Sequence, residues 1–564
     1  MTEERNQELS RRNFAKIAGG AVAGVALTSL AGCTGAAGAS GSAGPTGPAG
    51  PAGPAGPVGA LVNSPGAVFT KKYDVDLVVV GSGHGGMVAA AAAAQAGAKV
   101  LVIDVSSVTG GGAMYGSGAI SAYGITNYTD FLTYTEGLND PDLARTYIET
   151  FRGTFIPWLT QINAYVTPNT ATGEATMGKG EAGALKGRMY FDSLAKVVTG
   201  AGGTIVTKTR GFKILTDTKG KVAGVRASTW TKSPLDKTQD TFDIAAKAVL
   251  LATGSFFCNG ELMQRYVGPN ADLALAMGSP FNRGDSMAMA AEVGAAFSRS
   301  MSTFAGTLCA ITTTKPVELD PEAFEAAQAA NVGKESSLGT ALSVGRLSPP
   351  SWIGSWRPGL TAVTSYGILV NLDGNRFIDE ASPIDTKVQR AAESVLAQRE
   401  GMAFVVGDSG VYGAVSSSKT SIDAITAAGG NVVVANTLSD FANSLSAMGV
   451  WGGNLINTIN QYNASIDNST TPSLKPPRTS GFYKISTPPF YAIPVRCAVL
   501  HNYGGVAINK SGEVIDRQRN SIPGLYAAPH AAGGIFNSIW AGGDALSGTF
   551  GYIAGKSAAA YVKS

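Results

Sequence analysis

Cysteine and histidine are scarce in this 564-residue chain, which has four cysteines and three histidines. It contains no C-x-x-C pair and no C-x-x-C-H haem motif, so we expect no haem, no iron–sulfur cluster and no structural zinc. After Cys33, only Cys258, Cys309 and Cys497 remain. Their spacing leaves open whether two of these three form a disulfide.

A strong excess of either charge is also missing. Lys and Arg number 43 against 40 Asp and Glu, which gives a formal net charge of +3, and only 15% of residues are charged. This balance predicts no nucleic-acid partner. The early apolar stretch at 17–32 is too short, and too rich in alanine and glycine, for a permanent membrane helix.

The first 70 residues are typical of export and tethering. Residues 10–16, SRRNFAK, look like a twin-arginine signal, and Leu30-Ala31-Gly32-Cys33 resembles a lipobox. We therefore predict a signal at 1–33, a lipidated Cys33 that anchors the protein to the membrane, and a periplasmic or cell-surface location. The alternative is a plain cleaved signal with an incidental cysteine. Residues 34–70 are uncharged with Gly-Pro-X triplets, which predicts an extended tether.

A dinucleotide-binding pattern follows the tether at 76–104. An apolar run at 77–80 leads into Gly81, Gly83 and Gly86 in G-x-G-x-x-G spacing, and a second apolar run ends on Asp104. Gly81 permits the tight turn, Gly83 lets the backbone approach a pyrophosphate, and Gly86 lets the helix pack on the strand. Asp104 can accept hydrogen bonds from a ribose. The alternative is a glycine-rich strand–helix turn that binds nothing.

The rest of the chain suggests one nucleotide-binding domain interrupted by an insertion. A second glycine-rich loop spans 110–118, a hairpin at 212–228 turns at Lys219-Gly220, and the apolar strand 248–251 ends in small residues. The segment from about 360 to 495 alternates helices and short strands, and glycine pairs return after 501. We predict boundaries at 71–345, 346–500 and 501–564.

Seven signatures in order resemble the flavoprotein family of fumarate reductases and succinate dehydrogenases, in its flavocytochrome c type branch, with urocanate reductase and 3-ketosteroid dehydrogenases as relatives. Besides 81–86, they are AKAVLLATGSF (246–256), GDSMAMAAEVGA (284–295), ILVNLDGNRFIDE (368–380), YGGVAIN (503–509), IPGLYAAPHAAGG (522–534) and AGGDALSGTFGYIAG (541–555). The resemblance implies an α/β fold: a Rossmann-like FAD-binding domain in two parts, interrupted by a mobile α+β capping domain. It also implies hydride transfer between flavin N5 and a substrate carbon–carbon bond.

The resemblance assigns a set of residues to the cofactor. His530 stands where the family usually has a glutamate near the ribityl chain, so we expect a cofactor contact or a packed histidine there. The segment 542–546 looks like a helix N-terminus, and the resemblance implies that its backbone N–H groups point at the flavin's N1/O2 edge; the alternative is an ordinary helix start. The full predicted set is Gly81, Gly83, Gly86, Asp104, Gly111, Gly112, Ala252, Thr253, Gly254, Asp285, His530, Gly543, Ala545 and Leu546.

The chain departs from the family at the substrate positions. The family's catalytic arginine falls on Ile384, and its carboxylate-binding arginine falls on Trp540. The relay glutamate and arginine become Leu360 and Val363, and a histidine pair becomes Leu500-His501. An arginine clamp gives a carboxylate strong bidentate hydrogen bonds, which this chain would lack. We therefore predict a neutral, planar or aromatic substrate that contacts Trp540, Ile384 and Leu500, with fumarate a poor one.

A different proton donor is then required. His501 is expected to titrate near neutrality, and Tyr503 and Tyr115 offer phenols, as in ketosteroid dehydrogenases. Each has a packing role as its alternative. Arg376 and Glu380 are predicted to form structural ion pairs in the capping domain.

The function predicted is that of an exported FAD oxidoreductase that reduces an activated carbon–carbon double bond. Because no haem motif is present, its electrons must come from another protein, quinol-linked or a cytochrome. One alternative is a ketosteroid-type dehydrogenase that runs the same chemistry in the oxidative direction. The other is a lipoprotein that binds a small molecule on a degenerate flavin fold without catalysis.

Overall fold

A computed structural model describes residues 71–116, 118–181, 183–230, 240–311, 367–380, 391–413, 422, 426, 431–537 and 539–564. The predicted signal and tether lie outside these residues, as do Leu360, Val363 and Ile384. The side chain of Tyr115 is not described either. In this part of the chain, no helix is both long and apolar enough to cross a membrane.

The main sheet is built around β1, whose side chains at 77–79 are fully buried. β1 pairs in parallel with β2 and β9, and a strand covered on both faces is expected to be continuously apolar. Among the described residues the sheet has eight strands in the order β16-β17-β9-β1-β2-β6, with the β7–β8 hairpin paired to β9. The bounds are β1 Lys71–Val80, β2 Val100–Ile103, β6 Thr204–Val206, β7 Thr209–Thr216, β8 Val222–Thr229, β9 Thr241–Leu251, β16 Glu513–Ile515 and β17 Ser521–Ala527.

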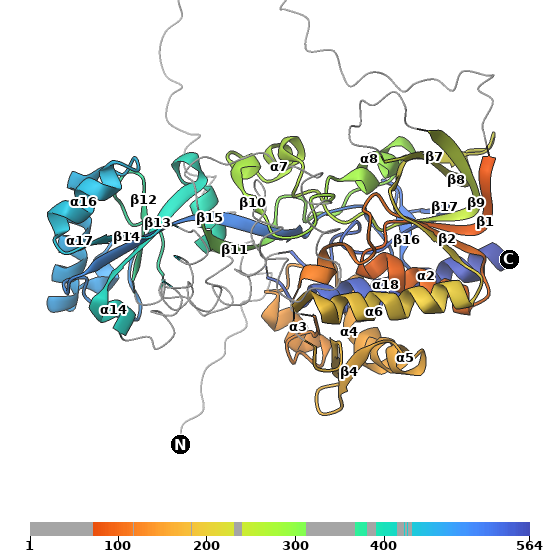
Figure 1. The fold of residues 1–564 in the computed structure, drawn as a ribbon, viewed down its shortest axis with the longest axis horizontal. Coiled ribbons are helices and arrows are strands. Elements are labelled where there is room, and N and C mark those ends of the chain that lie inside the picture. The colour runs from red at the N-terminus through yellow and green to blue at the C-terminus, as the bar shows by residue number, and fades with distance from the viewer. Residues whose placement is uncertain are drawn as a thin grey trace, which may run out of the picture. The chain divides into compact units, whose positions relative to one another are not determined.

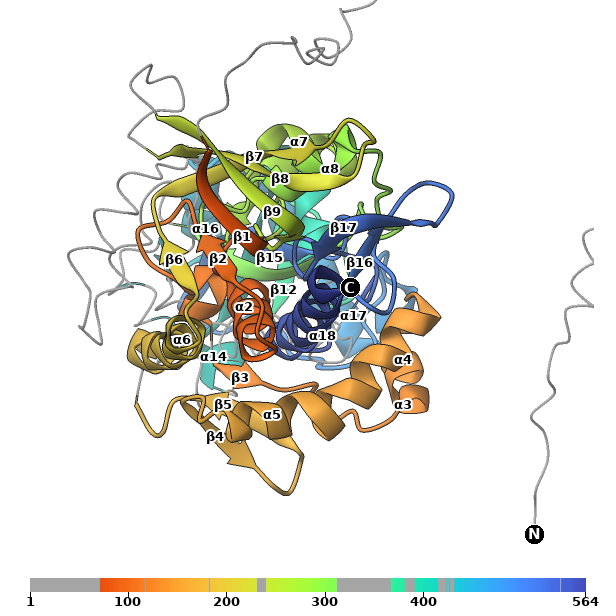
Figure 2. The same ribbon diagram turned by 90° about the vertical axis from the view of Figure 1, so that its right-hand side faces the viewer.

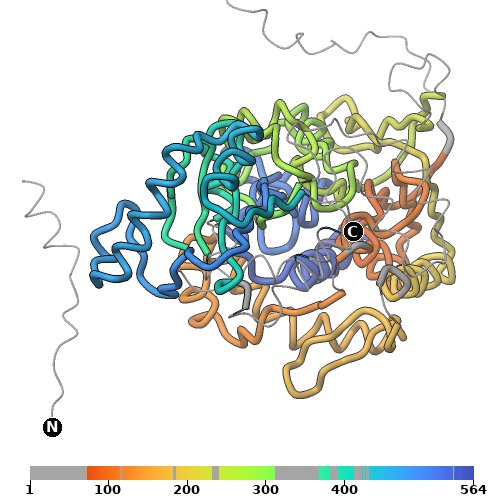
Figure 3. Tube along the Cα trace, turned by 60° about the vertical axis from the view of Figure 1, so that its left-hand side comes forward, coloured from red at the N-terminus to blue at the C-terminus, as the bar shows by residue number. Residues whose placement is uncertain are grey.

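Glycine is required where β1 turns into helix α2 (His84–Gln95). Gly81 has a φ of 107°, and a Cβ on it would lie 2.3 Å from the carbonyl oxygen of Ala252. The alanines of α2 are buried because the C-terminal helix α18 (Gly543–Lys563) approaches closely: a Cβ on Gly555 would lie 2.3 Å from the oxygen of Ala89. Figure 2 shows α2 between α18 and α6 (Gly183–Gly200). The trace in Figure 3 also shows α2 (red) beside the C-terminal helix α18 (blue).

A second sheet of six strands lies in the described part of the chain, in the order β10-β15-β13-β12, with β11 and β14 also paired to β15. It is mainly antiparallel, and α16 (Leu438–Ser446) packs on β14 and on α17 (Gly452–Asp467), as Figure 1 shows. The bounds are β10 Leu275–Ala276, β11 Phe304–Ala310, β12 Ile368–Asn371, β13 Met402–Asp408, β14 Val433–Ala435 and β15 Phe490–Asn502, with α14 at Ser409–Gly413. The predicted fold class, α/β with an α+β insertion, is confirmed.

The long strand β15 positions the site, because its last residues include Leu500 and His501. β10 and β11 pair with β15, although both strands precede the domain boundary predicted at 345/346. β15 itself runs across the second predicted domain boundary, at 500/501.

The remaining elements are β3 Ala119–Ile120, β4 Val166–Asn169, β5 Glu174–Met177, α3 Tyr128–Tyr134, α4 Pro141–Thr150, α5 Ile156–Gln161, α7 Gly260–Tyr266, α8 Asp285–Glu292, a π-helix at Phe151–Phe155 and short 3-10 turns at Gly111–Tyr115, Ala271–Leu273, Arg399–Gly401 and Thr471–Ser473.

The structure tests two interpretations of the sequence, one about the cysteines and one about an ion pair. Cys258, Cys309 and Cys497 are all buried, and no disulfide joins any two of them. The predicted structural ion pair is present: Arg376 Nη2 lies 2.6 Å from Glu380 Oε2, and both residues are buried. Arg478, fully buried, donates to the same carboxylate at 3.0 Å.

Candidate functional site

A cavity of about 300 Å³ lies where the main sheet's parallel strands end. The last residues of β1 and β2 and the first residues of α2 and α18 line it, which is the usual ligand position in an open α/β sheet. Most residues predicted to bind the cofactor line this cavity: Gly81, Gly83, Asp104, Gly111, Gly112, Ala252, Thr253, Gly254, Asp285, His530 and Gly543. Gly86, Ala545 and Leu546 are buried beside it in α2 and α18.

At one end of the cavity the lining is main chain at glycine residues. A Cβ built on Gly83 would meet no atom within 4 Å, so the main chain there faces open space. Gly110 N donates to Ser82 O at 3.0 Å, which brings the second glycine loop against the first. The N-terminus of α2 presents N–H groups at the same place. These features fit a pyrophosphate.

Asp104, at the end of β2, also stabilises the glycine turn. Its carboxylate accepts hydrogen bonds from Ser82 N (2.5 Å), Ser82 Oγ (2.6 Å) and Ser106 N (2.7 Å). Asp104 also lines the cavity. The sequence predicted the ribose contact but not the role of this carboxylate in holding the turn.

Two further contacts join residues from distant parts of the chain. Arg210 lines the cavity and pairs with Asp285 in bidentate fashion, with Nε–Oδ2 at 3.1 Å and Nη2–Oδ1 at 2.8 Å. Ser286 N–H donates a hydrogen bond to Thr253 Oγ1 at 3.0 Å. Sequence reasoning missed Arg210, because its partner is 75 residues away.

The other end of the cavity is formed by imidazole and indole rings around the start of α18. A Cβ on Gly543 would lie 3.2 Å from Trp540 Nε1 and 3.3 Å from His530 Nε2. The rings of His530 and His501 stack with centroids 3.8 Å apart. Leu500, His501 and Trp540, all predicted at the substrate site, line the cavity here.

Burial controls the protonation of these two histidines. Desolvation lowers the pKa of His530 to about 4. It also holds the pKa of His501 well below its ordinary value, and the neighbouring His530 lowers it further. His501 is therefore neutral near pH 7, whereas the sequence led us to expect titration near neutrality. Its Nε2 is buried and has no hydrogen-bond partner among the described residues.

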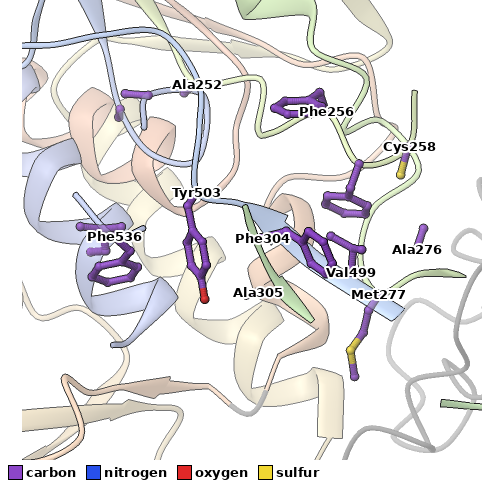
Figure 4. Packing of buried hydrophobic residues seen from close by; sticks show 14 of the residues in the cluster. Ala252, Phe256, Cys258, Ala276, Met277, Phe304, Ala305, Val499, Tyr503 and Phe536 are labelled. Atoms are coloured by element: carbon purple, nitrogen blue, oxygen red, sulfur yellow. The ribbon is translucent and has the colours of Figure 1, made fainter. Parts of the chain in front are cut away.

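The other candidate proton donors are placed differently. Tyr503 does not line the cavity and is only 3% exposed. Its ring packs against Phe536, 6.1 Å away, as Figure 4 shows, and against the edge of His501 at 5.4 Å. Tyr115 ends a short turn next to the glycine loop. Ile384 lies outside the described residues.

A buried polar cluster at the start of α2 and α18 was not predicted. His84, a variable position of the glycine fingerprint, bonds Tyr190 Oη through Nε2 (2.8 Å) and Ser547 Oγ through Nδ1 (3.1 Å). Its Nδ1 is 3.7 Å from Asp544 Oδ1. Desolvation lowers the pKa of His84 to about 3 and raises that of Asp544 to about 7.

Comparison with known proteins agrees with this geometry. A family model described as FAD binding domain matches residues 76–545. The chain is 27% identical over 512 residues to the fumarate reductase (cytochrome) of Shewanella frigidimarina, covering 87% of this chain and 78% of that one. It is 25% identical over 504 residues to the vinyl phenol reductase of Lactiplantibacillus plantarum, covering 82% and 90%.

Among solved structures, the open conformation of a flavocytochrome c3 fumarate reductase superposes with a TM-score of 0.63 at 22% identity, over 88% of this chain and 79% of that one. This likeness shows a shared fold. The bare backbone at one end of the cavity and the helix N-terminus at the other fit the two ends of FAD. The chain belongs to the FAD binding domain family and is an FAD-dependent oxidoreductase similar to the fumarate reductases.

Proposed function

We propose that this protein reduces an activated carbon–carbon double bond in a neutral, planar or aromatic substrate, and that fumarate is a poor substrate. The glycine turns, Asp104 and Asp285 would hold the adenosine and pyrophosphate, and the first turn of α18 would face the flavin. When bound, FAD supplies the hydride. The chain's own residues then have to hold the substrate, exclude water and supply a proton.

The observation that supports this proposal is the lining of the cavity near His501. Leu500 and Trp540 lie there, and the one arginine or lysine among the described lining residues is Arg210, which is already paired with Asp285. A dicarboxylate at this end would lose its hydration without gaining a cationic partner from these residues. An aromatic ring would gain by contact with Trp540. Vinyl phenol, named for one relative, joins such a ring to a double bond.

His501 is proposed to position the substrate. His501 lines the cavity, and its buried Nε2 has no partner among the described residues, so we propose that a substrate oxygen or hydroxyl satisfies it. We propose Tyr115 as the group that delivers the proton, because a neutral imidazole at His501 is a weak acid. Tyr503 contacts the edge of His501 and is proposed to hold that ring in place. The H501Q, Y115F and Y503F variants separate these roles, because only loss of a proton donor removes a limb from the pH–rate profile.

Export and electron supply are part of the same proposal. The twin-arginine motif and Cys33 support export and lipid anchoring, and the absence of a C-x-x-C-H motif supports an external quinol-linked or cytochrome donor. We also propose the FAD-binding parts at 71–345 and 501–564 with a capping domain between them. Replacing Cys33 with Ala should release the protein from washed membranes. A C33A protein that stays bound would contradict lipid anchoring.

The catalytic test uses reduced enzyme without oxygen. Enoates, enones and aromatic acrylates are added one at a time, and flavin reoxidation is followed by absorbance. We expect an aromatic or neutral compound to be fastest. Turnover with an artificial electron acceptor and a saturated substrate, but none in the reductive assay, would instead establish a ketosteroid-type dehydrogenase. A preparation without flavin absorbance would contradict catalysis altogether.

A further inference from the structure

The loop between β3 and α3 holds an aromatic residue in an unusual conformation. Tyr123 has a φ of 54°, in the left-handed region that L side chains rarely adopt. A non-glycine residue stays in that region only when its surroundings fix it there, and such residues concentrate at ligand sites.

One carboxylate on β5 fixes the loop from both sides of Tyr123. Glu174 accepts hydrogen bonds from Ser121 Oγ (2.8 Å), Ala122 N (3.0 Å) and Gly124 N (3.3 Å). Arg152 binds Glu174 at 2.7 Å and also donates to the carbonyl oxygens of Thr172 and Ile125. The Arg152 and Glu174 side chains are only 15% and 13% exposed, so this charge-assisted pair is well shielded from solvent.

The loop also lies directly on the start of α18. A Cβ on Gly542 would be 1.9 Å from Ser121 O, so backbone meets backbone at that point. The loop is thus fixed relative to the helix N-terminus that is proposed to face the flavin. Because its main chain is held on two sides, the position of Tyr123 at the cavity is set before any ligand binds.

Tyr123 lies at the cavity and its ring contacts a second aromatic ring. Tyr123 lines the cavity while remaining 48% exposed, and its ring meets Trp540 edge to face at 5.6 Å and 70°. Trp540 in turn lies 6.3 Å from the ring of His501. Trp540 therefore contacts both the half-exposed ring of Tyr123 and the buried ring of His501.

We propose that Tyr123 is a specificity-determining residue: with Trp540 it forms the wall that receives the ring of an aromatic substrate whose double bond is conjugated to that ring. This inference rests on the proposed function. Aromatic rings prefer edge-to-face and offset contacts of the kind that Tyr123 and Trp540 already make with each other. A flat ring placed against them would direct its polar substituent or its double bond towards His501.

The test measures ring binding separately from catalysis. The oxidised, flavin-loaded enzyme is titrated with 4-ethylphenol, a saturated aromatic probe, and with propionate, and flavin absorbance changes give each Kd. We expect Y123A to raise the Kd for 4-ethylphenol by about 10-fold or more, because an aromatic contact and the area it buries are lost. Y123F should stay within about 3-fold, because the ring is kept. Propionate binding should be the same in all variants.

Two more variants distinguish a ring contact from general damage. E174Q weakens the support of the loop and should raise the 4-ethylphenol Kd in the same direction as Y123A. F482A is the matched control, since Phe482 is 50% exposed and does not line the cavity, and it should bind both probes like the parent enzyme. Flavin content and melting temperature show that each variant is folded.

Y123A with unchanged 4-ethylphenol binding, or a parent enzyme that does not bind the probe, would overturn the inference. The proposed function fails by a different result, namely that reduced enzyme is reoxidised fastest by fumarate. The two failures are therefore distinguishable, because one is read from the equilibrium of the oxidised enzyme and the other from turnover of the reduced enzyme.

Discussion

Replacing Asp544 with Asn should change how stability depends on pH. The Asp544 side chain is 18% exposed in the first turn of α18, and burial raises its pKa from an ordinary 3.8 to about 7. The unfolded carboxyl group ionises near 3.8, whereas the folded one keeps its proton until about pH 7. The contribution of this group to stability is therefore complete below pH 3.8 and is lost as pH rises through 7.

The size of the effect follows from the two pKa values. A difference of about three units, at about 1.4 kcal/mol per unit, gives a change of at most about 4 kcal/mol across this window. The D544N side chain does not ionise, so the stability of the parent relative to D544N should fall by up to that amount between pH 4 and pH 7.5. Subtracting the two proteins removes the contribution of His84, which both retain.

Urea unfolding of flavin-free protein at several pH values measures this difference. E261Q is the control for a carboxylate removed from another helix, because Glu261 is 77% exposed on α7. A parent-minus-D544N difference that does not change with pH, or that rises with pH, would refute the argument that Asp544 is protonated in the folded protein.

Two more predictions concern the cofactor turn and the second sheet. G81A should purify without flavin, measured as the ratio of flavin to protein absorbance, because its Cβ would lie 2.3 Å from the oxygen of Ala252; a normally loaded G81A would contradict the tight turn. E380Q should lose about 3–5 kcal/mol in the free energy of unfolding, because it leaves two buried arginines, Arg376 and Arg478, without their carboxylate. A loss below about 1 kcal/mol, the size expected for an exposed ion pair, would contradict a buried ion-pair network around Glu380.

Local pattern predicted the centre of the fold well. The strand, glycine turn, helix and terminal Asp104 are neighbours in sequence, and each has a steric or hydrogen-bonding reason to be the residue it is. The hairpin turning at Lys219-Gly220 was predicted for the same reason and is present as β7 and β8.

The site was harder to predict because its properties depend on contacts between distant residues. Arg210 meets Asp285 across 75 positions, and Glu174 fixes a loop 50 positions away. The pKa of His501 is lowered by burial and by the electrostatic effect of the neighbouring His530, neither of which is visible in the residue type. His84 occupies a variable position in the fingerprint, so the pattern gave no reason to single it out.

The rates at which different compounds reoxidise the reduced enzyme test the central claim most directly. Fumarate and a series of aromatic and neutral compounds with conjugated double bonds are each mixed separately, at equal concentration, with reduced enzyme, and the rate of flavin reoxidation is recorded for each compound. The absence of an arginine or lysine among the described lining residues near His501 predicts that an aromatic or neutral compound is fastest and fumarate slow. Fumarate as the fastest oxidant would contradict the account.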